Sequence, residues 1–133
     1  MGGSTTGQAH TLSRSLRVLL CDDTHQVRLL LRTEMTLEPD LEIVGEATNG
    51  AEAIELARES QPDVVVLDLT MPVMDGLEAL PRIREAAPAA RVIMLSAHGA
   101  SEMEARAVAA GASLYIEKTA TTSEIVLAVR SSE

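Results

Sequence analysis

The chain has 133 residues, of which 46% are apolar, and its twenty acidic and eleven basic residues give a net charge of −9. This length predicts one domain, and one Tyr with no Phe or Trp predicts an aliphatic core. The surplus of acid argues against direct binding of nucleic acid, since residues for phosphate neutralisation and base stacking are both scarce. The apolar runs are too short to span a bilayer, and no secretory signal is visible. The single cysteine, Cys21, cannot form an internal disulfide, so we expect a cytoplasmic protein without membrane contact.

The chain divides into a short tail and one folded unit. Residues 1–14 are polar and rich in Gly, Ser and Thr, which predicts a disordered N-terminal tail, followed by a domain over residues 15–133. Within the domain, five short apolar segments flanked by turn residues have the pattern of buried parallel strands. In chain order they are Leu16–Cys21, Leu41–Ala47, Val64–Leu67, Val92–Leu95 and Leu114–Ile116.

Stretches with helical spacing follow each of these segments. Four are preceded by a capping residue three positions before a Glu, which is a signal for the start of a helix. These pairs are Asn49 with Glu52, Asp75 with Glu78, Ser101 with Glu104, and Thr121 with Glu124. Pro81 lies inside the third helical stretch, so we expect a distorted first turn there, or a regular helix that begins only near Leu80. The alternation of strand and helix predicts an α/β fold with a parallel sheet covered on both faces.

Polar side chains follow four of the predicted strands. They are Asp22 and Asp23, Asp68, Ser96 and Lys118. Because ligands bind beyond the carboxyl ends of strands in an open parallel sheet, we expect these groups to form one site. Three close carboxylates need a cation, and hard oxygen ligands suit Mg²⁺. With a hydroxyl and an ammonium beside them, they provide the positioning and charge neutralisation that phosphoryl transfer requires, with Asp68 as the candidate nucleophile.

Together these residues resemble the receiver domain of two-component response regulators. The resemblance covers roughly residues 15–131 and rests on motifs that occur in order at strand ends: Asp22-Asp23, Asp68, Met71-Pro72, Met74-Asp75-Gly76, Ser96-Ala97, Tyr115 and Lys118. It implies a doubly wound (βα)5 flavodoxin-like fold with strand order 2-1-3-4-5. It also implies a signalling module of a phosphorelay rather than an enzyme.

The resemblance assigns metal and phosphate roles to four residues. Asp68 is similar to the phosphoacceptor that takes a phosphoryl group from a sensor histidine kinase. Asp23 and Asp68 resemble direct Mg²⁺ ligands, and Asp22 resembles a ligand that acts mainly through water. The backbone carbonyl of Thr70 is similar to the third protein ligand.

The resemblance also implies a conformational switch. Lys118 resembles the phosphate-binding lysine, Ser96 the switch hydroxyl, and Tyr115 the switch aromatic. Thr70 and His98 lie where the family tunes its dephosphorylation rate. The face that switches would consist of the fourth helix, the fifth strand and the fifth helix. The resemblance also allows a homodimer on activation, built either by the fourth and fifth helices or by the first and fifth.

One junction departs from the commonest receiver pattern. Lys118 is followed by Thr119, whereas many receivers have Pro there. A Lys-Thr junction is more typical of receivers that precede a helix-turn-helix output domain. We therefore expect either the receiver part of a DNA-binding transcriptional regulator or a single-domain regulator.

Three other functions were weighed against the receiver. A haloacid-dehalogenase-like phosphatase also forms an aspartyl phosphate, but it has a second acid two residues after the nucleophile, where this chain has Thr70. A flavodoxin-type electron carrier stacks aromatic rings on its flavin, and this chain has one ring. A degenerate receiver that only binds partners would not need the acidic pair, Asp68 and Lys118.

Overall fold

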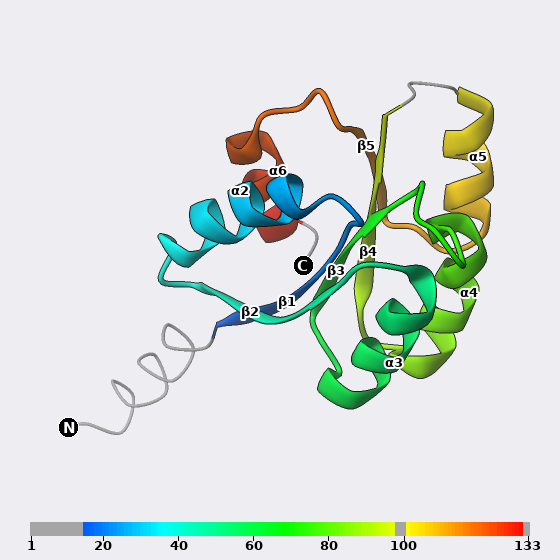
Figure 1. The fold of residues 1–133 in the computed structure, drawn as a ribbon, viewed down its shortest axis with the longest axis horizontal. Coiled ribbons are helices and arrows are strands. Elements are labelled where there is room, and N and C mark those ends of the chain that lie inside the picture. The colour runs from blue at the N-terminus through cyan, green and yellow to red at the C-terminus, as the bar shows by residue number, and fades with distance from the viewer. Residues whose placement is uncertain (1–14, 98–100, 132–133) are drawn as a thin grey trace.

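A five-stranded parallel sheet runs through the molecule, with helices on both sides of it (Figure 1). The computed structural model describes residues 15–97 and 101–131, so the predicted tail, His98 and the last two residues lie outside the described residues. The strands are β1 (Leu16–Cys21), β2 (Leu41–Ala47), β3 (Val64–Asp68), β4 (Arg91–Ser96) and β5 (Leu114–Glu117). Their order is β2-β1-β3-β4-β5, which confirms the predicted topology.

Five described helices connect and cover the strands. They are α2 (His25–Thr36), α3 (Gly50–Ser60), α4 (Gly76–Ala86), α5 (Ser101–Ala109) and α6 (Thr122–Ser131). In Figure 1, α2 and α6 lie on one side of the sheet, and α3, α4 and α5 lie on the other. In the parts of the chain that are described, no helix combines the length and the apolar character needed to cross a membrane.

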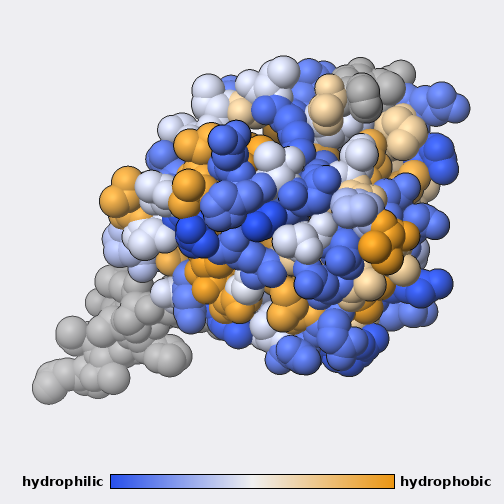
Figure 2. Space-filling view, in the orientation of Figure 1, coloured by the Kyte–Doolittle hydropathy of each residue, from blue (hydrophilic) through white to orange (hydrophobic). Residues whose placement is uncertain are grey.

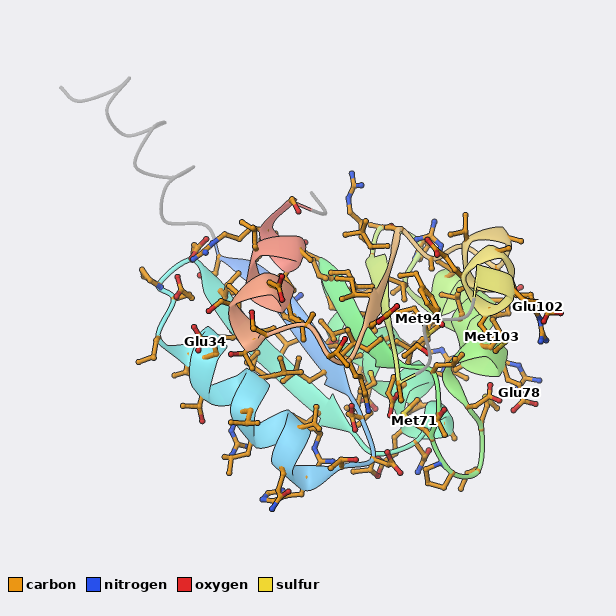
Figure 3. The ribbon with its side chains drawn as sticks, turned by 90° about the horizontal axis from the view of Figure 1, so that it is seen from above. Glu34, Met71, Glu78, Met94, Glu102 and Met103 are labelled. Atoms are coloured by element: carbon orange, nitrogen blue, oxygen red, sulfur yellow. The ribbon has the colours of Figure 1, made fainter. Side chains whose placement is uncertain are left out.

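The strands divide the core into two aliphatic layers, because successive side chains of a strand point to opposite faces. In β3, Val64 and Val66 pack in the layer under α2 and α6, and Val65 and Leu67 pack in the layer under α3, α4 and α5. The second layer is rich in methionine, and Met71, Met94 and Met103 lie on the α4–α5 side of the sheet (Figure 3). Unbranched Met side chains fill irregular space where aromatic rings are missing.

The predicted cap of α4 at Asp75 is confirmed, and the helix does not begin only near Leu80. The helix begins at Gly76, with a complete capping box: the Glu78 N–H donates to Asp75 Oδ1 at 2.8 Å, and the Asp75 N–H donates to Glu78 Oε1. Pro81 lies within the helix and is exposed. The capping box and the burial of Leu80 and Ile83 therefore outweigh the hydrogen bond that Pro81 cannot make.

The other capping predictions have mixed outcomes. The Glu52 N–H donates to the Asn49 side chain at 2.9 Å, and Thr121 and Glu124 form a reciprocal capping box. By contrast, α5 begins at Ser101 itself, and the side chain of this residue is outside the described set.

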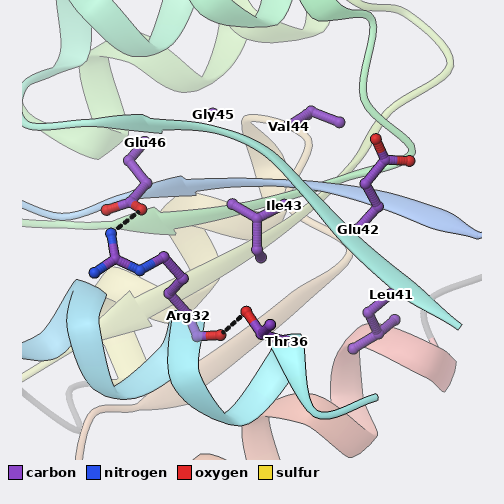
Figure 4. A pocket seen from close by; sticks show the side chains of 8 residues that line it. All are labelled: Arg32, Thr36, Leu41, Glu42, Ile43, Val44, Gly45 and Glu46. Atoms are coloured by element: carbon purple, nitrogen blue, oxygen red, sulfur yellow. Dashed lines mark hydrogen bonds and ion pairs between the residues drawn. The ribbon is translucent and has the colours of Figure 1, made fainter. Parts of the chain in front are cut away.

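Strand β2 forms one edge of the sheet and pairs irregularly with β1. The register shifts between Val18 and Leu19, which pair with Ile43 and Gly45, so Val44 is an extra residue. A cavity of about 570 Å³ lies between β2 and α2, beside the Arg32–Glu46 ion pair (Figure 4). None of the predicted site residues lines this cavity. The molecular face in Figure 2 is mostly hydrophilic, with apolar side chains in small groups.

Candidate functional site

The carboxyl ends of β1 and β3 bring three carboxylates together. Cys21 pairs with Leu67 across these two neighbouring strands. The residues that follow each of them, Asp22 and Asp23 after Cys21 and Asp68 after Leu67, therefore lie beside each other. One oxygen from each of the three lies within 4.8 Å of the others. Asp22 and Asp68 are each 2% exposed, whereas Asp23 is exposed. The site is therefore a buried acidic pair with a third carboxylate at its mouth.

Local hydrogen bonds orient the two buried carboxylates. Asp22 Oδ1 accepts from the Thr24 N–H at 2.8 Å, and Asp68 Oδ1 accepts from the Thr70 N–H at 3.2 Å. Each carboxylate thus turns one oxygen toward the backbone that follows it, in the manner of an Asx turn. The second oxygen of each carboxylate, Oδ2, is the one that contacts Lys118.

Lys118 lies between these second oxygens. Its Nζ is 2.9 Å from Asp22 Oδ2 and 3.0 Å from Asp68 Oδ2. The backbone holds Lys118 in place, because its N–H donates to the carbonyl of Ser96 at 2.6 Å. The sole lysine of the sequence therefore neutralises part of the charge of the acidic pair.

Burial and mutual repulsion shift the protonation of the site. Burial and the neighbouring charge of Asp22 raise the pKa of Asp68 to about 6, against the opposing effect of Lys118. Burial acts to lower the pKa of Lys118, but its hydrogen bonds and ion pairs with the two acids outweigh this and raise it. Burial raises the pKa of the Cys21 thiol beneath the site, which keeps that residue unreactive.

The donor set fits a hard divalent cation. Three carboxylates with oxygens this close, two of them buried, repel one another more than a single ammonium compensates. Mg²⁺ prefers oxygen ligands and retains waters, so it needs few protein groups. Asp23, Asp68 and Asp22 provide ligands of this kind.

The backbone after Asp68 is held in a strained, closely packed loop. Val73 has φ +68°, a value that is rare for a β-branched residue, and its side chain is 85% exposed. The Gly76 N–H donates to the Leu69 carbonyl, and a Cβ at Gly76 would lie 2.2 Å from the Asp68 carbonyl oxygen. Only glycine fits there, so the start of α4 packs directly on the backbone of Asp68.

The structure places the remaining predicted residues at different distances from this cluster. Ser96 is fully buried at the end of β4, next to Leu95, which pairs with Asp68. Tyr115 pairs with Met94 further back along the sheet and packs, half-buried, against the α4–α5 side of the core. Thr70, two residues after Asp68, is exposed, and His98 lies outside the described residues.

Two residues near the site, Arg28 and Gly50, make contacts that have no signal in the sequence. Arg28 Nη1 donates to the Asp22 carbonyl at 2.7 Å, and its Nε lies 3.1 Å from Glu46 Oε1. The Gly50 N–H donates to the Met74 carbonyl at 2.9 Å. In the sequence, Arg28 is recognisable only as a polar position of a helix, and Gly50 only as the residue after a helix cap. Their contacts could not be predicted, because they arise from packing between elements.

The chain is similar to known proteins over most of its length. Residues 18–130 match the family model described as the response regulator receiver domain. The chain is 41% identical over 113 residues to the chemotaxis protein CheY of Thermotoga maritima, covering 85% of this chain and 93% of that protein. It is 38% identical to the response regulator protein VraR of Staphylococcus aureus, covering 87% of this chain but 56% of VraR.

A solved structure shares the fold over nearly the same length. It is described as the CheX–CheY–BeF3–Mg²⁺ complex from Borrelia burgdorferi. The TM-score is 0.81 with 30% identity, and the match covers 92% of both chains.

Proposed function

Because the chain belongs to the response regulator receiver domain family, we propose that it is a phosphorylation-dependent signalling module with Asp68 as its phosphoacceptor. The observation that carries this proposal is the cluster itself. The carboxylates of Asp22, Asp23 and Asp68 converge within 4.8 Å, with Lys118 Nζ about 3 Å from two of them. This is the arrangement that in-line phosphoryl transfer to a carboxylate requires.

The donor is a phosphohistidine of a sensor histidine kinase. An Asp68 oxygen attacks the phosphorus, the new O–P bond forms as the P–N bond breaks, and the imidazole takes the leaving electron pair. Asp23, Asp68 and the Thr70 carbonyl would hold Mg²⁺, with Asp22 acting through water, and the ion would supply charge neutralisation for the phosphoryl oxygens. Lys118 binds one of these oxygens, for which it must exchange its contact with Asp68. Thr70 and His98 tune the later hydrolysis of the acyl phosphate.

The phosphoryl group adds charge and three acceptor oxygens at the carboxyl edge of the sheet. We propose that Ser96, at the end of β4, donates its hydroxyl to one of them. The end of β4 then shifts toward the phosphoryl group, and Tyr115 on β5 moves with it. The face formed by α5, β5 and α6 is the part of the molecule that a partner reads, and it is a surface for a homodimer on activation.

The chain spans about half the length of VraR and nearly the whole of CheY. We therefore propose two settings for the same switch, a DNA-binding regulator controlled by this receiver or a single-domain regulator in the cytoplasm. In both settings the switching face, rather than direct contact of this domain with nucleic acid, transmits the signal.

Incubation with acetyl phosphate in the presence and absence of Mg²⁺ tests the proposal. Mass spectrometry is expected to find one Mg²⁺-dependent phosphoryl adduct, which Asp68→Asn removes. The emission of Tyr115, the sole tyrosine, is expected to change in parallel. An unmodified wild-type protein would overturn the receiver function, and sustained turnover of a small phosphoester would favour the phosphatase alternative. An adduct without any change in emission would leave Asp68 in its role but overturn the part assigned to Tyr115.

A further inference from the structure

One side chain outside the predicted site closes the loop that carries the first two acids. Arg28 lies in the first turn of α2, and its N–H donates to the Thr24 carbonyl at 3.1 Å. Its guanidinium returns to the same loop and donates to the Asp22 carbonyl at 2.7 Å. Arg28 thus binds the loop twice, once through its backbone and once through its side chain.

The contact with the Asp22 carbonyl completes the fixation of that residue. The Asp22 N–H donates to the Ala47 carbonyl, Oδ1 accepts from Thr24, and Oδ2 pairs with Lys118. The Asp22 carbonyl and the Asp23 nitrogen belong to one planar peptide. The guanidinium that holds this carbonyl therefore also fixes the orientation of the Asp23 backbone at the end of β1. Asp23 is exposed and lies beyond Cys21, the last residue of β1.

A second ion pair anchors the guanidinium to the sheet. Arg28 Nε lies 3.1 Å from Glu46 Oε1 on β2, and the Arg28 side chain is 12% exposed. The other Glu46 oxygen pairs with Arg32 at 2.8 Å, and the Arg32 side chain is 42% exposed (Figure 4). Glu46 therefore joins two arginines, of which only Arg28 has a described contact with the Asp22–Asp23 loop.

The charge of Arg28 and a role in positioning the loop predict opposite effects of its removal on Mg²⁺ binding. A cation beside a metal pocket weakens the binding of a second cation by repulsion. Removing the Arg28 charge would therefore strengthen Mg²⁺ binding if electrostatics alone mattered. A residue that orients a ligand does the reverse, because its loss lets the ligand move away from the productive geometry.

We propose that Arg28, anchored by Glu46, is a positioning residue that holds the Asp22–Asp23 peptide in the orientation the cation site requires. This proposal rests on the proposed function, because the cation concerned is the Mg²⁺ of the receiver pocket. Arg28 acts through the backbone of Asp22 and does not touch the metal or the phosphoryl group. The planar guanidinium suits this role, because it reaches the carbonyl and the carboxylate at once, which an ammonium does less well.

The test compares Arg28→Met and Arg28→Lys with the matched control Arg32→Met, which also loses an ion pair to Glu46. Isothermal titration with MgCl2 is expected to give a Kd at least roughly tenfold weaker for Arg28→Met. Arg28→Lys is expected to lie in between, and Arg32→Met to stay within about twofold of the wild type. A Kd for Arg28→Met equal to or tighter than that of the wild type would overturn the proposal, since that is the charge effect alone.

A second measurement does not depend on the metal. Hydrogen–deuterium exchange of the Mg²⁺-free proteins is expected to be faster over residues 22–28 in Arg28→Met and unchanged there in Arg32→Met. Equal exchange in both variants would overturn the proposal even if the wild type fails to bind Mg²⁺, a failure that would count against the proposed function instead. If circular dichroism finds Arg28→Met unfolded, the same two measurements on Arg28→Lys decide.

Discussion

At the residue scale, the charge on Asp68 is costly before any cation binds. The carboxylate is 2% exposed, lies beside Asp22, and has its pKa raised to about 6. At neutral pH the metal-free protein must therefore hold a buried anion that burial and Asp22 both disfavour. We predict that Asp68→Asn raises the free energy of unfolding by roughly 1–3 kcal/mol at neutral pH without Mg²⁺. Urea denaturation in EDTA measures this.

Asp23→Asn is the matched control for Asp68→Asn. Both changes remove a proposed metal ligand, but Asp23 is exposed, so its charge carries little desolvation cost. Its substitution is expected to change stability by less than about 0.5 kcal/mol in EDTA while still weakening Mg²⁺ binding. A lower stability for Asp68→Asn than for the wild type would contradict the repulsion argument.

The sequence predicts which residues come together at the site, because these residues follow strands. Asp22 and Asp68 lie at the ends of buried strands, whereas Lys118 follows β5, which is an apolar but only partly buried edge strand; the parallel sheet brings all three positions to one edge. Arg28 could not be found this way. Its partner Glu46 is eighteen residues away, and their contact depends on how α2 packs against the edge strand β2.

At the element scale, the N-terminus of α3 supports the loop after Asp68. The Gly50 N–H donates to the Met74 carbonyl, and a Cβ at Gly50 would lie 2.4 Å from that oxygen. We predict that Gly50→Ala displaces the loop, lowers the free energy of unfolding by roughly 1–3 kcal/mol and weakens Mg²⁺ binding. Chemical denaturation and calorimetric titration measure the two effects.

Gly45→Ala separates this contact from the general effect of replacing glycine. A Cβ at Gly45 would meet the end of the Leu19 side chain at 3.1 Å, which can move. We expect a small change in stability and an unchanged affinity for Mg²⁺. If Gly50→Ala also binds Mg²⁺ as the wild type does, α3 does not hold the loop in the way the contact suggests.

The observed ends of strands and helices match the predicted ones where strong local signals in the sequence agree with one another. The strands β1 and β2 have the predicted bounds, because short apolar runs end at turn residues. The start of α4 also agrees with the capping pair Asp75 and Glu78, and Pro81 does not delay the helix as expected. The extra residue Val44 in β2 has no local signal, since it arises from the pairing of two strands.

At the scale of the whole molecule, the alternation of strand and helix specified a covered parallel sheet but not its strand order. The order 2-1-3-4-5 came from the family resemblance, and the observed sheet has it. The order matters for function, because it makes β3 the neighbour of both β1 and β4. Asp68 therefore lies between Asp22 and Asp23 on one side and Ser96 on the other.

Stability of the whole domain should depend on pH and Mg²⁺ together. Because the pKa of Asp68 is raised from 3.8 to about 6, the folded protein binds more protons than the unfolded chain between these values. The contribution of Asp68 is thus fully present below about pH 4 and is lost as the pH rises through about 6. Mg²⁺ binds the deprotonated site, so its stabilising effect must grow over the same range.

We predict that a saturating concentration of MgCl2 raises the Tm by a larger increment at about pH 7.5 than at about pH 5. Differential scanning calorimetry of wild type and Asp68→Asn at both pH values measures this. The variant lacks the titrating group, so its smaller Mg²⁺ increment is expected to change less with pH. An Mg²⁺ increment in the wild type that is equal at both pH values would mean that the cation does not compete with the proton on Asp68. Its binding would then have to be sought at carboxylates that stay ionised throughout, rather than at the buried pair held by Lys118.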